Sequence, residues 1–69
     1  MKSQLNKLRK IRDKFVNKFK ERNQIFLNRT AHWKESDNAV EFENKTYELE
    51  SALNDLNTVI DSLENYVAM

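Results

Sequence analysis

The 69-residue sequence contains no glycine, no proline and no cysteine. Glycine and proline form most tight turns and hairpin loops, so their absence argues against a β-rich fold and favours long helices. The absence of cysteine excludes disulfides, thiolate metal sites and thiol nucleophiles. A chain of this length makes at most one domain, near the lower size at which a chain buries enough surface to fold alone.

Long hydrophobic runs are also missing. Apolar runs such as 25–27 are only a few residues long, whereas a membrane-spanning helix needs about 20 apolar residues. The first three residues are followed by mixed polar and charged residues, not by the apolar core of a signal peptide. We therefore expect no membrane span, a chain that is cytoplasmic as made, and any export by a signal-peptide-independent route together with a partner.

Residues 39–67 have the clearest pattern in the chain. Mainly apolar residues recur there at alternating steps of three and four, which is typical of a helix that packs along its whole length against another helix. This seam consists of Ala39, Phe42, Thr46, Leu49, Leu53, Leu56, Ile60, Leu63 and Val67. Ala52, Val59 and Tyr66 flank it on one side, so the apolar stripe is broader than one partner helix covers.

The first half also has a helical pattern, with a less regular apolar face. One heptad register holds Leu5, Leu8, Phe15, Phe19, Phe26 and Trp33, and its other positions hold Arg12, Arg22 and Arg29. Neighbouring apolar residues such as Ile11 and Ile25 widen the face, as in a bundle helix with more than one neighbour. We expect the arginines to lay their stems on the core and extend their charged groups to acids on the second helix.

Polar residues between the halves mark the turn. Ser36, Asp37 and Asn38 all favour helix N-termini, and Asn38 followed by Glu41 has the spacing of a capping box. With no glycine, any left-handed residue in the turn must be Asn, Asp or Lys. The sequence predicts an all-α fold in a single domain: helix 1 over about 3–34, a turn at about 35–37 and helix 2 over about 38–68. Two such helices form an antiparallel hairpin, and we expect two hairpins to pair into a four-helix bundle.

The two halves carry opposite charge. Residues 1–30 hold ten Lys or Arg against two acids, a balance of +8, and residues 31–69 hold two Lys against nine acids, a balance of −7. One interpretation is that a basic helix and an acidic helix lie side by side. The other is that the basic half contacts an anionic partner such as nucleic acid or lipid.

No residues form a recognisable catalytic or metal-binding pattern. His32 is the single histidine, and one histidine with a nearby carboxylate such as Glu35 is too small a ligand set for zinc or non-haem iron. The serine hydroxyls lack a nearby base, and a glycine-rich phosphate loop is impossible. We predict a protein that is not an enzyme, with no cofactor and no small-molecule substrate.

Nucleic-acid binding is the runner-up hypothesis. A basic stretch precedes a heptad seam, the order found in basic-region zippers. Its candidate anion-binding residues are Lys7, Arg9, Lys10, Lys14 and Lys18. Against this, the stretch also holds large apolar residues such as Phe15, and the break at 36–38 separates it from the seam. This alternative is a homodimeric protein that binds nucleic acid with its basic helix.

The turn and its flanking helices resemble the WXG superfamily, small helical-hairpin proteins of type VII secretion in Gram-positive bacteria. In that family a Trp-x-Gly turn joins two long antiparallel helices and an aromatic residue follows in the second helix. Trp33 matches the tryptophan, Phe42 matches the later aromatic residue, and residues 48–56 resemble the second helix. Glu35 stands in place of the glycine, and the family's C-terminal Tyr-x-x-x-acid export signal is missing. The resemblance implies a signal-less subunit that is exported with a partner, or an accessory that packs on the targeting domain of a secreted effector.

Both the pattern and the resemblance predict a protein that works by binding another helical protein, either a second copy or a different chain, to form a dimer. The candidate partner-binding residues are Leu8, Phe15, Phe19, Phe26, Trp33, Phe42, Leu49, Leu53, Leu56, Ile60, Leu63 and Val67.

Overall fold

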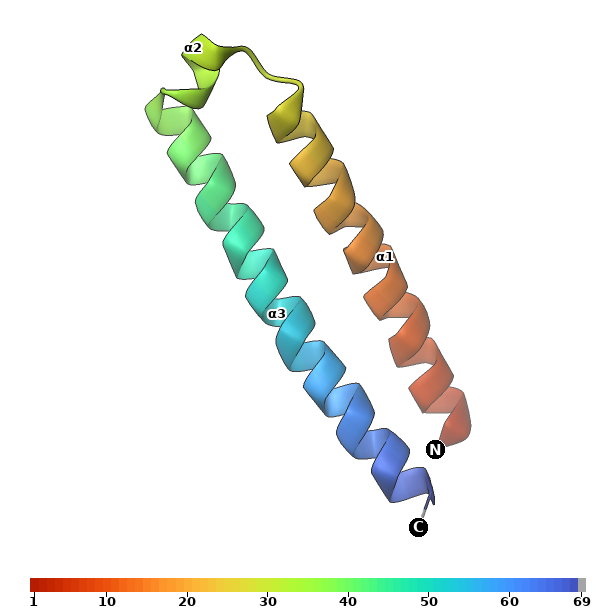
Figure 1. Ribbon diagram of the computed structural model, residues 1–69. Helices are drawn as coiled ribbons and strands as arrows, with labels where there is room; N and C mark the ends of the chain where they lie inside the picture. Colours follow the sequence, from red (N-terminus) through yellow and green to blue (C-terminus); the bar gives the residue numbers. More distant parts are fainter. Residues whose placement is uncertain (69) are drawn as a thin grey trace.

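The computed structural model describes residues 1–68, and these form three helices: α1 (Lys2–Leu27), α2 (Ala31–Lys34) and α3 (Asp37–Ala68). Helices α1 and α3 run side by side in opposite directions, α2 lies at the tip between them, and both ends of the chain lie at the other end of the molecule (Figure 1). No strand occurs among residues 1–68. The predicted all-α class and the hairpin arrangement of two long helices are confirmed.

Helix α3 begins where the serine at its N-terminus caps it. The Ser36 hydroxyl accepts a hydrogen bond from the Ala39 amide at 3.4 Å, and the Ser36 carbonyl accepts from the same amide at 3.1 Å. The predicted capping box of Asn38 and Glu41 is therefore wrong, because the helix starts before Asn38. Asp37 lies in the first turn, where its negative charge suits the helix dipole.

The prediction that helix 1 reaches residue 34 is also wrong, since α1 ends at Leu27. Thr30 has an extended backbone (φ −66°, ψ 156°), and its hydroxyl accepts a hydrogen bond from the Trp33 amide at 3.2 Å. A threonine in this conformation starts a new helical turn instead of continuing the old one. The connection thus covers residues 28–36, with the single turn α2 inside it, and not only 35–37.

The connection reverses the chain without any left-handed residue among those that the structure describes. The residues after α1 and α2, Asn28 and Glu35, both have right-handed backbone angles (φ −84°, ψ −5° and φ −90°, ψ −4°). The expectation of a left-handed Asn, Asp or Lys was wrong, because a reversal spread over a short helix needs no tight turn.

The core is the line where α1 meets the predicted seam. The fully buried seam residues are Ala39, Thr46, Leu53 and Ile60, with exposed fractions of 2, 7, 8 and 0%. The other five seam residues are half-buried, and Leu5 of α1 is buried. The heptad spacing therefore gave the inward face of α3 correctly.

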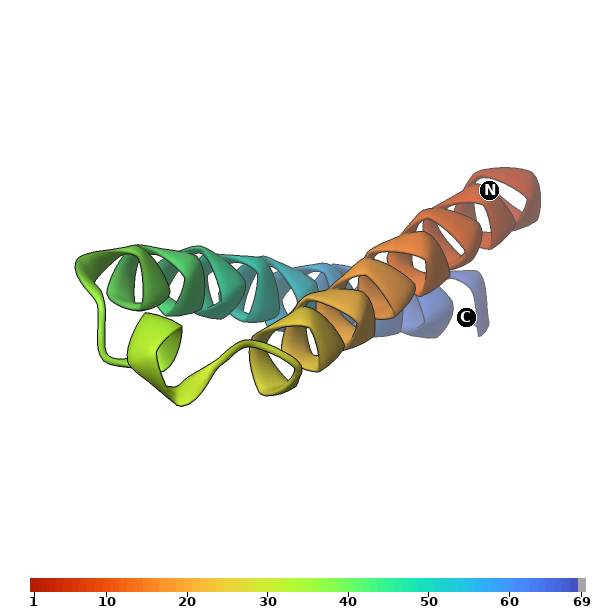
Figure 2. The ribbon, with the colours of Figure 1, turned by 90° about the horizontal axis from the view of Figure 1, so that it is seen from above.

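The hairpin is long and thin, with extents of 53 × 15 × 11 Å. Seen from above, α1 crosses α3 obliquely (Figure 2). Between residues 1 and 68 no helix is both long and apolar enough to cross a lipid bilayer.

Candidate protein-interaction surface

Three aromatic side chains close the tip of the hairpin. The ring centroids of Phe26 and Trp33 are 5.8 Å apart, those of Trp33 and Phe42 are 5.8 Å apart, and those of Phe26 and Phe42 are 6.3 Å apart. Both Trp33 contacts are edge-to-face, the geometry that aromatic pairs favour. Trp33 from α2 thus packs on one aromatic ring from each long helix and caps the end of the core.

Arg22 joins the two long helices next to this cluster. Its Nε donates to the Thr46 hydroxyl at 3.0 Å, its Nη2 donates to the Phe42 carbonyl at 3.0 Å, and its guanidinium lies 4.0 Å from the centroid of the Phe42 ring. Thr46 in turn donates to the Phe42 carbonyl at 3.0 Å, so its buried hydroxyl is satisfied. The seam position of Thr46 is thus polar, and its buried hydroxyl both accepts from Arg22 and donates to Phe42.

The prediction that the register arginines reach acids on the second helix is wrong. Arg22 bonds a hydroxyl and a carbonyl, Arg12 bonds the adjacent Asp13 at 3.1 Å, and Arg29 lies over the Trp33 ring at 4.8 Å. Arginine heads are held close to their own helix or to the core because the acids of α3 lie mostly on its outer surface.

The basic and acidic helices do lie side by side, yet their charges hardly pair. Within residues 1–68 a single ion pair joins α1 to α3, between Arg9 Nη2 and Glu64 Oε1 at 2.8 Å. A pair this exposed contributes about 0.5 kcal/mol. The +8 and −7 halves therefore leave the hairpin with a basic long edge and an acidic long edge.

The five candidate anion-binding residues fall into two groups. Arg9 is held by Glu64, and Lys18 lies 3.6 Å from Glu21, so neither is a free cation. Lys7, Lys10 and Lys14 are exposed and form no ion pair with any residue that the structure describes.

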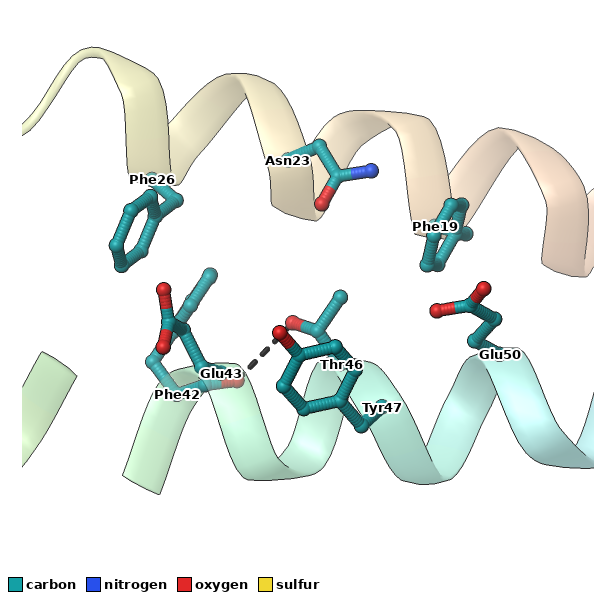
Figure 3. Close-up of a pocket in the computed structure, with 8 residues that line it drawn as sticks. All are labelled: Phe19, Asn23, Phe26, Phe42, Glu43, Thr46, Tyr47 and Glu50. Carbon is teal, nitrogen blue, oxygen red and sulfur yellow. Dashed lines mark hydrogen bonds between the residues drawn. The ribbon is translucent and has the colours of Figure 1, made fainter. Parts of the chain in front are cut away.

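One broad face of the hairpin is largely polar. Figure 3 shows a hollow there, of about 100 Å³, between Phe19 and Phe26 of α1 and Phe42 of α3. Asn23, Glu43, Thr46, Tyr47 and Glu50 complete its wall. Pockets for small-molecule ligands are usually about 300–1,000 Å³. The volume of this hollow is below that range.

The opposite broad face is apolar at its centre. A groove of about 110 Å³ is lined only by apolar residues: Phe15, Leu49, Ala52, Leu53 and Leu56. Ile11 lies one turn before Phe15, and Val59 lies one turn after Leu56, so both extend the groove toward the chain ends. Phe15, Ile11 and Val59 remain 46, 44 and 49% exposed. We call this surface, Ile11, Phe15, Leu49, Ala52, Leu56 and Val59, the groove face.

The twelve candidate partner-binding residues differ in how far they are buried within the hairpin. Ile60 is fully buried and Leu53 is 8% exposed, because α1 of the same chain covers them. Within the hairpin Ile60 is thus covered by its own chain, and its contact with a partner stays a prediction. Phe15 is exposed on the groove face. The other nine are half-buried between α1 and α3, namely Leu8, Phe19, Phe26, Trp33, Phe42, Leu49, Leu56, Leu63 and Val67.

Three residues of the groove face were not among the candidates: Ile11, Ala52 and Val59. The signal for Ala52 and Val59 was the apolar flank beside the seam, at a step of seven residues. A flank position contacts a third helix and not the second, so it points to an external partner more directly than the seam itself does.

His32 is exposed on α2. Nowhere in residues 1–68 do three or more His, Cys, Asp or Glu side chains come close enough together to hold a metal ion.

Fold and surface together place the chain in a broad class, that of small all-helical hairpins with an apolar outer face. No protein-family model, curated protein or solved structure is significantly similar to the chain.

Proposed function

We propose that this protein is a non-enzymatic binding module that packs on another helical protein and completes a four-helix bundle with it. The observation behind this proposal is the groove face, where large apolar side chains stay exposed along the middle of both long helices. Soluble proteins seldom leave a contiguous apolar groove uncovered.

The small size of the hairpin's own core supports the same conclusion. Only four hydrophobic residues among those described are buried, while nine large ones remain 40–66% exposed. Chains of this size seldom bury enough apolar surface for more than a few kcal/mol of stability, and a further helix pair is one way to supply the rest. A partner therefore contributes to stability as well as to function.

The more specific proposal is that the module serves type VII secretion, as a partner or targeting subunit that is exported with a secreted effector. Its support is the resemblance to the WXG superfamily, together with the place of Trp33 at the tip between two long antiparallel helices. Phe42 contacts Trp33 from the start of α3, where the resemblance expects an aromatic residue.

Co-expression with the helical proteins encoded beside its gene tests this function. We expect one of them to co-purify in a 1:1 complex that is more helical and melts at a higher temperature than either chain alone. Replacing Phe15 with Glu should weaken that complex, since it places a charge on the groove face, whereas Lys20→Glu, an exposed change elsewhere on α1, should leave it intact. Failure to bind any of these proteins, with or without the substitutions, would contradict the secretion proposal.

A second candidate is a homodimeric protein that binds nucleic acid with α1. It is favoured by the three exposed lysines, Lys7, Lys10 and Lys14, which no acid in residues 1–68 neutralises. Binding to generic duplex DNA would then weaken steeply with salt, because each phosphate contact releases counterions. Fluorescence anisotropy between about 50 and 200 mM salt separates the candidates, since the bundle proposal expects essentially no DNA binding at either concentration.

A further inference from the structure

The long edges of the groove face carry opposite charges. On α1, Lys7, Lys14 and Lys18 lie four residues before, three after and seven after Ile11, so they share its side of the helix. On α3, Glu48 and Asp55 lie four residues before and three after Ala52, on the corresponding outer side. All five are exposed. The apolar groove is therefore bordered mainly by lysines along α1 and mainly by acids along α3. Each border also holds one charge of the other sign, Glu21 one turn after Lys18 on α1 and Lys45 seven residues before Ala52 on α3.

The other broad face also carries acids along α3, but its hollow is walled partly by polar side chains. Glu43 and Glu50 line that hollow, and Arg9 and Glu64 line a pocket with Asn6 near the chain ends. Arg9 and Glu64 already pair with each other within the hairpin, at 2.8 Å. The groove face is thus the face that combines a groove lined only by apolar side chains with charged borders.

Contacts within the hairpin show which residues of α1 and α3 lie at the same height, meaning the same position along the long axis of the hairpin. Arg22 bonds Thr46, Phe26 stacks on Phe42, and Phe15 lines the groove with Leu53. By the same register Lys14 lies at the height of Asp55, and Lys18 lies within about one turn of Glu48.

We propose that the groove face is covered by a second copy of this chain, with both tips at the same end, so that α1 of each copy lies on α3 of the other. A two-fold axis along the hairpin produces this arrangement and makes the contact self-complementary. Phe15 of each copy then packs over Ala52 and Leu56 of the other. Lys14 of each copy faces Asp55 of the other along both borders. Lys18, which also lies 3.6 Å from Glu21 of its own helix, faces Glu48 of the other copy.

The alternative two-fold arrangement places the tips at opposite ends. It lays α1 on α1 and α3 on α3, so lysines face lysines and acids face acids along each border. Like charges at such positions oppose association, and opposite charges favour it. The charge pattern therefore selects the arrangement with the tips together.

The available area also fits a second copy. The whole broad face that contains the groove measures 53 × 15 Å, or roughly 800 Å², which is what each partner buries in an interface of standard size. A second copy therefore contacts this face along its full length and not only at the groove. This inference rests on the proposed function and names the helical protein that completes the bundle.

Distance measurement between introduced labels tests the arrangement. The chain has no cysteine, so His32→Cys at the tip takes a single spin label. Sedimentation equilibrium should show a helical dimer, and pulsed electron paramagnetic resonance should give a distance under roughly 30 Å, because packed helices lie about 10 Å apart. A distance between the two labels close to the 53 Å length of the hairpin would place the tips at opposite ends and would overturn the proposal. A folded monomer would also overturn it.

Charge exchange tests the borders independently. Lys14→Glu and Asp55→Lys should each weaken the dimer about tenfold at low salt, since each change acts twice in a symmetric pair. The double variant should recover to within about threefold. Both residues are exposed, so the fold tolerates the changes. The matched variants Lys20→Glu and Asp61→Lys, on the other face, should have little effect. A double variant that is weaker than either single one would contradict the proposed pairing.

These results separate the inference from the function on which it rests. A monomer that forms a complex with a different helical protein overturns self-pairing and supports the binding-module proposal. A chain that binds neither itself nor any helical protein encoded beside its gene overturns both.

Discussion

At the scale of the residue, Arg22 shows how a charged side chain replaces an apolar one in a helical interface. Its stem lies in the seam between α1 and α3, two of its nitrogens bond Thr46 and Phe42, and its planar group stacks on the Phe42 ring. These three contacts from one planar guanidinium group fix the position of α1 relative to α3 along the helix axes. Lysine carries a compact ammonium group instead of a planar guanidinium, so it cannot make the two hydrogen bonds and the ring contact at the same time.

Arg22→Lys should therefore destabilise the protein by about 1.5 kcal/mol, or roughly 6–12 °C in Tm, measured by thermal melting with circular dichroism. Arg12→Lys is the matched control, because Arg12 bonds only the neighbouring Asp13, and its Tm should change by less than about 2 °C. Equal losses in the two variants would mean that the Arg22 contacts add no stability.

At the scale of the element, the short helix α2 decides how the chain turns. It is a single turn, too short to be stable by itself. Two contacts hold it: the Thr30 cap on the Trp33 amide, and the packing of the Trp33 ring on Phe26 and Phe42. The cap starts the turn in the orientation that brings the indole onto the core.

Thr30→Ala should cost about 1 kcal/mol, since it removes the hydroxyl that accepts from the Trp33 amide. Hydrogen exchange should show that this amide loses protection while the middle of α3 keeps it. Thr58→Ala provides the control, because the Thr58 hydroxyl is exposed and bonds only Asn54 of its own helix, and alanine is the better helix former. A larger loss from Thr58→Ala than from Thr30→Ala would contradict the role assigned to the cap.

At the scale of the whole molecule, stability depends on a line of contacts one residue wide. The hairpin is 11 Å thick in its smallest dimension, so it has no second layer to shield a defect in the seam. Leu53 is 8% exposed and also lines the apolar groove, so it belongs both to the contact with α1 and to the surface proposed for a partner.

Leu53→Asp should abolish both folding and assembly at 25 °C, because an unpaired buried carboxylate costs several kcal/mol and the seam is the only core among the described residues. Circular dichroism and sedimentation measure the two losses. Asn54→Asp adds the same charge at the exposed neighbouring position and should keep both helicity and mass. A helical Leu53→Asp chain of unchanged mass would contradict this account.

The sequence by itself determined the class of fold and the inward face of α3. Spacing of three and four residues is a property of one helix, so it is readable without knowledge of the neighbours. All nine residues of the seam are buried or half-buried as that spacing predicts. The start of α3 was likewise predicted to within one residue, because capping depends on local hydrogen bonds.

The tertiary structure decided what the arginines bond, where α1 ends and which apolar residues stay exposed. Each of these depends on distances between residues far apart in the chain. The Arg22 side chain meets Thr46 and not an acid, and Ile60 is fully covered by α1 while Phe15 remains open. Both Ile60 and Phe15 occupy heptad core positions, and only the oblique packing of α1 on α3 distinguishes the buried residue from the exposed one.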